Sequence, residues 1–156
     1  MELILWRHAQ AEDGLPDLPR ALTEKGQRQA RQMAGFLRPR LPENTRILVS
    51  PATRAQQTAR ALTDDFITDS RLAPDAHPQA LLNAAGWPTA GGCVLIVGHQ
   101  PTLGQLAALL LTGNAGELSI RKGAIWWFSR RARLTGNDTA LRLVMPPDLL
   151  PASTHV

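Results

Sequence analysis

The chain has 156 residues and a formal net charge of +4, with 44% hydrophobic and 19% charged residues. This length fits one globular domain that buries roughly two-thirds of the surface of its unfolded chain. No stretch approaches the roughly 20 apolar residues of a membrane-spanning helix, and a single cysteine, Cys93, excludes an internal disulfide. Because the first residues also lack the basic segment of a secretory signal, we expect one cytoplasmic domain over residues 1–156 that does not bind a membrane.

The excess of positive charge favours anionic partners. However, the 17 lysines and arginines are scattered along the sequence and do not form one run. Their densest group, Arg130, Arg131 and Arg133, is more typical of a solvated turn than of a nucleic-acid-binding patch. We therefore expect no nucleic-acid partner, and we expect the chain to be a monomer.

The chain begins with a strand, a loop and a helix. Bulky apolar residues at 3–6 predict a buried strand of an α/β sheet. The segment 13–20 contains one glycine and two prolines and is expected to be a loop. Thr23 is then the expected N-cap of a helix that ends near residue 38. Gly26 inside this helix costs about 1 kcal/mol relative to alanine, so we expect a tertiary contact that requires it.

The same signals assign the rest of the chain. The predicted strands are 46–49, 93–97, 118–120, 124–129 and 140–145, the predicted helices are 52–66, 80–85 and 103–111, and the predicted hairpin turn is Gly136-Asn137. Strands that alternate with helices and are followed by antiparallel strands predict an α/β fold. We expect a three-layer α/β/α sandwich with a largely parallel central sheet and an antiparallel edge strand.

Arginine and histidine residues follow three of the predicted strands. Arg7 and His8 end the first, Arg54 lies shortly after the second, and His99 follows the third. If these strands are parallel, their carboxyl ends share one edge of the sheet, where open α/β sheets bind ligands. Forked arginine donors suit a phosphoryl group, and a neutral imidazole can attack phosphorus when a backbone carbonyl holds its other nitrogen.

This arrangement needs no metal. The sequence has no cluster of cysteine, histidine or carboxylate residues with the spacing of metal ligands. We therefore expect no metal and no cofactor at the predicted anion site.

Four sequence blocks resemble signatures of the histidine phosphatase superfamily, also called the phosphoglycerate mutase-like family. Arg7-His8-Ala9 is similar to its Arg-His-Gly signature. Residues 22–30, 50–59 and 97–101 resemble its Leu-Thr-x-x-Gly-x-x-Gln-Ala, Ser-Pro-x-x-Arg-Ala-x-Gln-Thr-Ala and Gly-His segments, in the expected order. The short length, the Gly-His-x-Pro form and the closing Met-Pro-Pro at 145–147 resemble the SixA type of phosphohistidine phosphatase.

The resemblance implies a phosphoglycerate mutase-like fold and roles for four residues. His8 would be the nucleophile and would form a phosphohistidine intermediate that water hydrolyses. Arg7 and Arg54 would hold the phosphoryl oxygens, and His99 would bind the transferring group and stabilise its transition-state charge. The implied activity is that of a metal-independent phosphatase of signal transduction.

The chain departs from the family pattern in two places. Ala9 stands where the family has a glycine after its catalytic histidine. Both residues are small, so the change only reduces the range of backbone conformations at this position. Larger members also place a glutamate after the second block to protonate an alkoxide leaving group. Asp75 is the best positional candidate for this proton donor, His77 is a weaker one, and the reading of Asp75 as a solvated loop residue stays open.

The lack of the family's glutamate proton donor favours one class of substrate over another. An imidazole that leaves from phosphohistidine needs less help from an acid than an alkoxide does. We therefore expect a protein that carries phosphohistidine as the substrate. The alternatives are a small phosphorylated molecule, which would make the chain a phosphomonoesterase, or a non-catalytic module that binds phosphate or nucleic acid in the same crevice.

Overall fold

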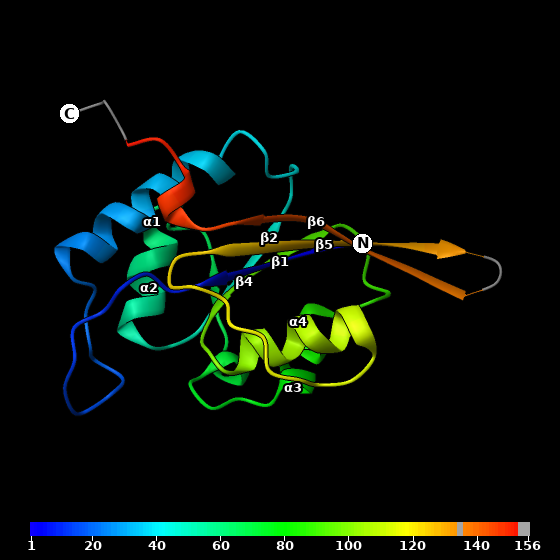
Figure 1. The fold of residues 1–156 in the computed structure, drawn as a ribbon, viewed down its shortest axis with the longest axis horizontal. Helices are drawn as coiled ribbons and strands as arrows, with labels where there is room; N and C mark the ends of the chain where they lie inside the picture. The colour runs from blue at the N-terminus through cyan, green and yellow to red at the C-terminus, as the bar shows by residue number, and fades with distance from the viewer. Residues whose placement is uncertain (134–135, 153–156) are drawn as a thin grey trace.

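A six-stranded sheet with helices on both faces forms the body of the protein in a computed structural model that describes residues 1–133 and 136–152 (Figure 1). The strands are β1 (Glu2–Arg7), β2 (Arg46–Val49), β3 (Ile67–Thr68), β4 (Cys93–Gly98), β5 (Ile125–Arg133) and β6 (Gly136–Met145). Their order is β3-β2-β4-β1-β5-β6. The first four strands of this order are parallel, and β5 runs antiparallel to both β1 and β6.

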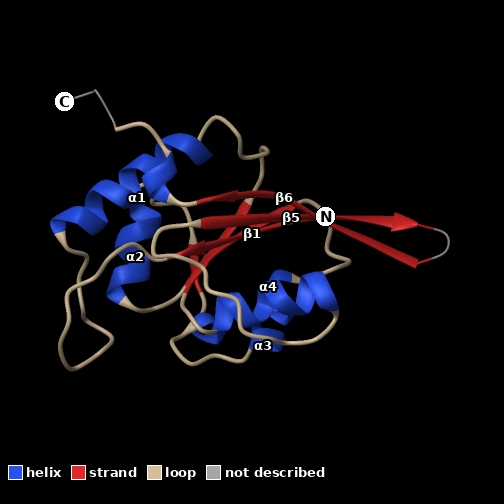
Figure 2. Ribbon diagram, viewed as in Figure 1, coloured by secondary structure: helices blue, strands red, loops and turns tan. Residues whose placement is uncertain are grey.

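Helices cover the two faces in pairs. Figure 2 shows α1 and α2 on one side of the sheet and α3 and α4 on the other. The helices are α1 (Glu24–Leu37), α2 (Thr53–Arg60), α3 (Pro78–Ala85) and α4 (Thr102–Thr112), with 3-10 turns η1 (Ser70–Leu72) and η2 (Pro147–Leu149). The predicted α/β sandwich is therefore confirmed.

The central strand β1 supplies both cores because its side chains alternate between the faces. Leu3 and Leu5 pack in the cluster that contains residues of α3 and α4. Ile4 and Trp6 pack in the opposite cluster, with residues of α1 and α2. All four side chains are fully buried, so the continuous apolar run at 3–6 reflects a strand that is covered on both faces.

The register of the parallel strands aligns their carboxyl ends. Arg7 of β1 pairs with Gly98 of β4, and the amide of His8 donates to the Gly98 carbonyl at 3.1 Å. On the other side of β4, the amide of Ser50 donates to the Val97 carbonyl at 3.1 Å. The residues that follow β1, β2 and β4 therefore meet at one edge of the sheet.

Two predicted elements differ from the structure for local reasons. Helix α2 ends at Arg60, whereas 52–66 was predicted. The hydroxyl of Thr63 accepts from the amide of Asp65 at 3.0 Å, a local bond that competes with helix formation. The predicted strand 118–120 is irregular, because the carbonyls of Leu118 and Ile120 accept from side chains of Gln100 and Arg7.

The predicted hairpin turn was placed too late in the chain. Gly136 and Asn137 already pair with Arg133 and Ala132 inside the β5–β6 ladder. The connection at 134–135 lies outside the described residues. Strand β3 and the turn η1 were not predicted at all, since each has only two or three residues.

The expected tertiary role of Gly26 is confirmed. Helix α1 begins after Thr23, whose hydroxyl accepts from the Gly26 amide at 2.9 Å. The helix start lies against the turn that follows β1, and a Cβ on Gly26 would stand 1.9 Å from the Gln10 carbonyl oxygen. Only glycine allows this approach without a shift of the backbone two residues after His8.

We predict that Gly26→Ala lowers the free energy of unfolding by about 1–3 kcal/mol, because the added methyl group overpacks the contact with Gln10. Gly35 on the same helix is the matched control. A Cβ there would meet nothing within 4 Å, so Gly35→Ala should raise stability by about 0.5–1 kcal/mol. Urea unfolding measures both, and equal effects of the two substitutions would contradict the close approach at Gly26.

Candidate active site

His8 is buried at the end of β1 with its ring orientation fixed. Its Nδ1 lies 2.8 Å from the carbonyl oxygen of Ala9. Because a carbonyl can only accept a hydrogen bond, Nδ1 carries the proton and Nε2 keeps its lone pair. The Ala9 amide in turn donates to the hydroxyl of Thr58 at 3.1 Å, and this hydroxyl donates to the Arg54 carbonyl at 2.8 Å. The imidazole is therefore held as a potential nucleophile by a chain of hydrogen bonds that reaches α2.

His99 stands beside His8 because β4 is the neighbour of β1. The centroids of the two rings are 5.2 Å apart. Nε2 of His99 lies 2.7 Å from Oγ of Ser50, which also accepts from the amide of Ala52 at 3.2 Å. A Ser50 hydroxyl that donates to Nε2 satisfies both groups and leaves the proton of His99 on Nδ1. This buried Nδ1 has no partner among the described residues, so it is a free donor beside His8.

Arg7 and Arg54 bring two guanidinium groups to the same edge. Nη1 of Arg7 donates to the Ile120 carbonyl at 2.8 Å. Arg54 is buried, and its two terminal nitrogens donate to the backbone carbonyl and the carboxylate of Asp17, each at 3.1 Å. The Nε–H group of each arginine is buried and has no partner within the described chain. Such donors favour an anion, since leaving one unpaired costs about 1–3 kcal/mol.

The environment keeps both imidazoles neutral. Burial lowers the pKa of His8 most, the bond to Ala9 opposes this, and the charges of Arg54 and Arg7 lower it further, to about 4. Burial and the neighbouring His8 lower the pKa of His99 to about 3. The sequence predicted that the arginines would lower the pKa of the nucleophile, but burial has the larger effect.

Asp17 is a site residue that the sequence did not reveal. It lies in the predicted loop 13–20 and forms ion pairs with both Arg54, at 3.1 Å, and Arg20, at 3.0 Å. Burial raises the pKa of Asp17, but the hydrogen bonds from Arg20 and Arg54 outweigh it and lower the pKa. No spacing pattern links a loop aspartate to a helix 37 residues later, so only the fold shows this contact.

Ser50 and Thr58 were part of a recognised block but had no predicted role. Thr58 lies four residues after Arg54 on α2, so both face the same side of that helix. Ser50 follows β2, next to the end of β4. The spacing of the block contained this signal, because its Ser50 contacts His99 and its Thr58 contacts the backbone next to His8.

Asp75 is not tied to the other predicted site residues. It is exposed in the segment between η1 and α3, with a backbone φ of 67°. The carbonyl of the next residue, Ala76, accepts from the hydroxyl of Thr102 at 2.7 Å, which places the segment beside the first turn of α4, close to His99 in sequence. The structure thus brings together Arg7, His8, Arg54 and His99, whereas Asp75 stays a prediction.

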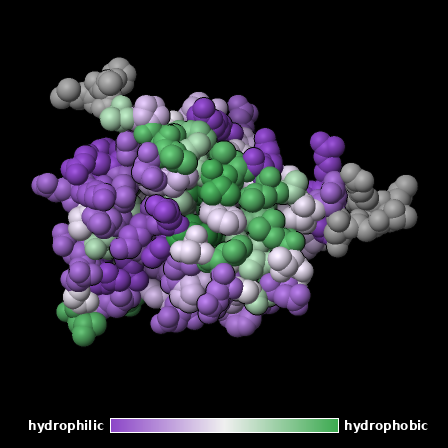
Figure 3. Space-filling model, viewed as in Figure 1, coloured by the Kyte–Doolittle hydropathy of each residue, from purple (hydrophilic) through white to green (hydrophobic). Residues whose placement is uncertain are grey.

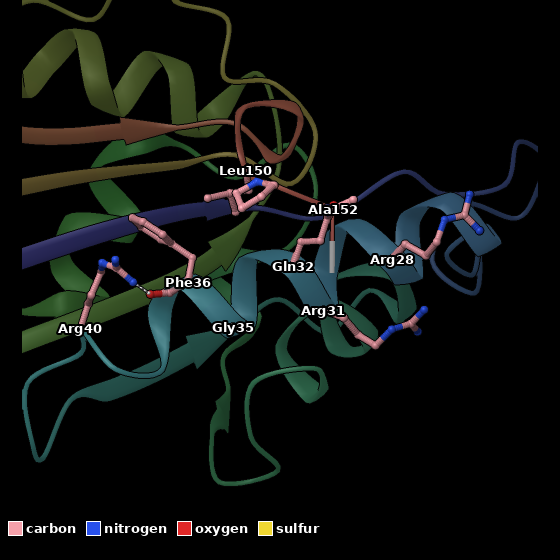
Figure 4. A pocket seen from close by; sticks show the side chains of 9 residues that line it. Arg28, Arg31, Gln32, Gly35, Phe36, Arg40, Leu150 and Ala152 are labelled. Atoms are coloured by element: carbon pink, nitrogen blue, oxygen red, sulfur yellow. Dashed lines mark hydrogen bonds between the residues drawn. The ribbon is translucent and has the colours of Figure 1, made fainter. Parts of the chain in front are cut away.

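Other features of the described residues lie away from this edge. They include no group of three or more histidine, cysteine, aspartate or glutamate residues that could hold a metal ion, and none of their helices is long and apolar enough to cross a membrane. A groove of about 810 Å³ runs along α1 (Figure 4), and Arg28, Arg31 and Arg40 line it together with the segment 150–152. None of the four converging site residues takes part in this groove.

Comparison with known proteins identifies the family. Residues 3–75 match the histidine phosphatase superfamily (branch 1). Phosphohistidine phosphatase SixA from Escherichia coli (strain K12) is 32% identical over 128 residues, which cover 73% of this chain and 76% of that protein. An uncharacterized protein of Picosynechococcus sp. is 34% identical over 173 aligned positions, which cover 97% of this chain and 100% of that protein.

A solved structure shares the fold over nearly the whole chain. The protein histidine phosphatase SixA complexed with tungstate superposes with a TM-score of 0.77 at 25% identity, and the match covers 95% of this chain and 98% of that one. The structural similarity therefore covers nearly the whole chain, and the family match at residues 3–75 includes Arg7, His8 and Arg54. This chain belongs to the histidine phosphatase superfamily and is similar within it to SixA.

Proposed function

We propose that this chain acts in the cytoplasm, as a monomer and without a metal, as a phosphatase that removes phosphoryl groups from histidine side chains of proteins. One observation carries the proposal. His8 has a free Nε2 lone pair, and its neighbours Arg7, Arg54 and His99 carry three buried N–H donors that have no partner among the described residues. A nucleophile among unpaired donors suits transfer of an anionic group.

In the first step, Nε2 of His8 attacks phosphorus. The bond between phosphorus and the substrate imidazole breaks, and the released ring nitrogen takes a proton from solvent. Nε of Arg7, Nε of Arg54 and Nδ1 of His99 donate to the phosphoryl oxygens, where negative charge is spread in the transition state. A neutral His8 is required, which agrees with its lowered pKa.

In the second step, water attacks the phosphorus of phosphorylated His8. The bond between phosphorus and Nε2 breaks, inorganic phosphate leaves, and the lone pair returns to Nε2. The Nδ1–H bond to Ala9 persists through both steps, so the ring does not have to rotate or exchange tautomers. One water is consumed for each phosphoryl group removed.

The proton supply favours phosphohistidine over an alkyl ester. The carboxylate that contacts Arg54 belongs to Asp17, and its lowered pKa keeps it ionised near neutral pH. Asp75 is exposed and makes no described contact with His8 or His99. A leaving imidazole tolerates this poor supply because its own nitrogen takes up a proton readily. The likeness to SixA, which is named a phosphohistidine phosphatase, supports the same substrate class.

We predict that the chain hydrolyses a phosphohistidine protein at least about 100-fold faster, in kcat/KM, than a sugar phosphate, because an alkoxide leaving group without an acid loses about 10²–10⁴ in rate. His8→Ala should abolish both activities. Phosphate release with the two substrates at equal concentration measures the ratio. A preference for the sugar phosphate would contradict the proposed substrate class and favour a phosphomonoesterase.

Asp75→Asn is the companion variant for this experiment. If Asp75 donates a proton, the variant loses activity on the alkyl ester by at least about tenfold and keeps most of its activity on phosphohistidine. Equal activity of the variant and the parent on both substrates would show that Asp75 is a solvated loop residue. Because Asp75 is exposed, the substitution should leave the fold intact.

The pKa of His8 predicts a pH dependence of stability. His8 binds a proton near pH 6.5 in the unfolded chain but only near pH 4 in the folded one. The contribution of neutral His8 to the free energy of unfolding is therefore fully present above pH 6.5. As the pH falls toward 4, the free energy of unfolding decreases by up to about 1.4 kcal/mol per pH unit, because the unfolded chain binds the proton more readily. Urea unfolding at pH 7.5, 5.5 and 4.5 should show a steeper loss for the parent than for His8→Asn. Parallel curves would mean that His8 is protonated as an ordinary histidine.

A further inference from the structure

The segment 12–21 extends from the active-site edge and ends in an apolar tip. It leaves the sheet after His8 and returns to the start of α1 (dark blue in Figure 1). Leu15 is 93% exposed and Leu18 is 53% exposed, although leucine is an unfavourable residue to leave in water. Figure 3 shows apolar atoms at the tip of this loop, separated by polar residues from the larger apolar area of the same face.

The loop is braced by its own contacts. The amide of Glu12 donates to the carbonyl of Ala21 at 2.8 Å and closes the base. Nη1 of Arg20 donates to the Glu12 carbonyl at 2.9 Å, and the same side chain pairs with Asp17 at 3.0 Å. These bonds order the backbone before any partner binds, so a contact at the tip costs little further conformational entropy.

The loop is also fastened to the phosphoryl-binding side of the site. Asp17 binds both terminal nitrogens of Arg54, and the Leu18 carbonyl accepts from the amide of Thr53 at 2.9 Å. Two residues of chain span at most about 7 Å, so Leu15 cannot lie far from Asp17. Leu18 is therefore held beside the start of α2, and Leu15 lies only a short length of chain away from the Asp17–Arg54 contact.

We propose that Leu15 and Leu18 are the contact through which this enzyme recognises the protein that carries the phosphohistidine. The inference rests on the proposed function. A small metabolite held by Arg54 is too short to cover side chains on the outer end of the loop, whereas the surface around a phosphorylated side chain of a protein is broad enough to do so. The partner surface is apolar where it meets Leu15, and burial of the two leucines supplies the affinity.

Two other surfaces compete for this role. The groove of Figure 4 carries Arg28 and Arg31, whose side chains extend from α1 and which would favour an acidic partner. Leu141 and Val144 on the edge strand β6, which are 39% and 41% exposed, are the second candidate. Among the described residues, no hydrogen bond joins either surface to Arg7 or Arg54, so the loop is the better candidate.

The test compares two substrates that share the same phosphorus–nitrogen bond, a phosphohistidine protein and free phosphohistidine. Leu15→Ser should raise KM for the protein about tenfold, since part of the gain from burying a leucine is lost. It should leave kcat for the protein and kcat/KM for free phosphohistidine within about twofold. Leu149→Ser is the matched control, because Leu149 in η2 is also an exposed leucine, at 70%. This substitution should leave KM and kcat unchanged for both substrates.

The outcomes separate this proposal from the proposed function. A parent enzyme that hydrolyses neither substrate contradicts the function itself, and the docking proposal with it. A parent that hydrolyses both, with an unchanged KM in Leu15→Ser, overturns the docking contact alone. The same holds if Arg28→Glu raises KM for the protein and Leu15→Ser does not, because the partner then binds along α1. Equal losses on both substrates would show that the leucine affects the site and not the partner.

Discussion

The hydrogen bond from Nδ1 of His8 to the Ala9 carbonyl is the interaction on which the site depends. It fixes the tautomer, and with it the ring nitrogen that can attack. The Ala9 peptide is itself held by Thr58, one turn along α2 from Arg54. One short helix therefore positions both the backbone next to His8, the proposed nucleophile, and the guanidinium of Arg54. Because β1 and β4 are paired neighbours in the sheet, His99 at the end of β4 lies beside His8 at the end of β1.

This site is built at a cost in stability. It buries Arg54 and two imidazoles at one edge of the sheet, together with three N–H donors that have no partner in the described chain. Asp17 offsets part of the positive charge on Arg54, and neutrality of His8 and His99 avoids two more charges. In the proposed mechanism, the oxygens of a phosphoryl group supply the missing acceptors. The folded enzyme is therefore prepared for an anion before the anion arrives.

The sequence predicted those parts of the molecule that depend on local pattern. The buried strands, the N-cap at Thr23 and the constrained Gly26 follow from residue type and spacing, and the strand ends placed Arg7, His8 and His99 at one edge. The ion pair between Asp17 and Arg54 could not be predicted, because it joins a loop to a helix through tertiary folding alone. Helix 52–66 was predicted too long since apolar periodicity continues past Arg60, whereas the Thr63 side chain bonds the backbone locally. The role of Asp75 stays a prediction.

The chemical identity of the trapped phosphoenzyme tests the proposed role of His8 most directly. The proposed mechanism places a phosphoryl group on His8, and this group should be labile in acid and stable in base. It also predicts attachment at Nε2, because Nδ1 is occupied by the Ala9 carbonyl. Rapid mixing with a phosphodonor, followed by peptide mapping and phosphorus–nitrogen correlated NMR, identifies both the residue and the ring nitrogen. Phosphorus on Nδ1, or a turnover-competent enzyme whose His8 never carries phosphorus, would contradict the mechanism.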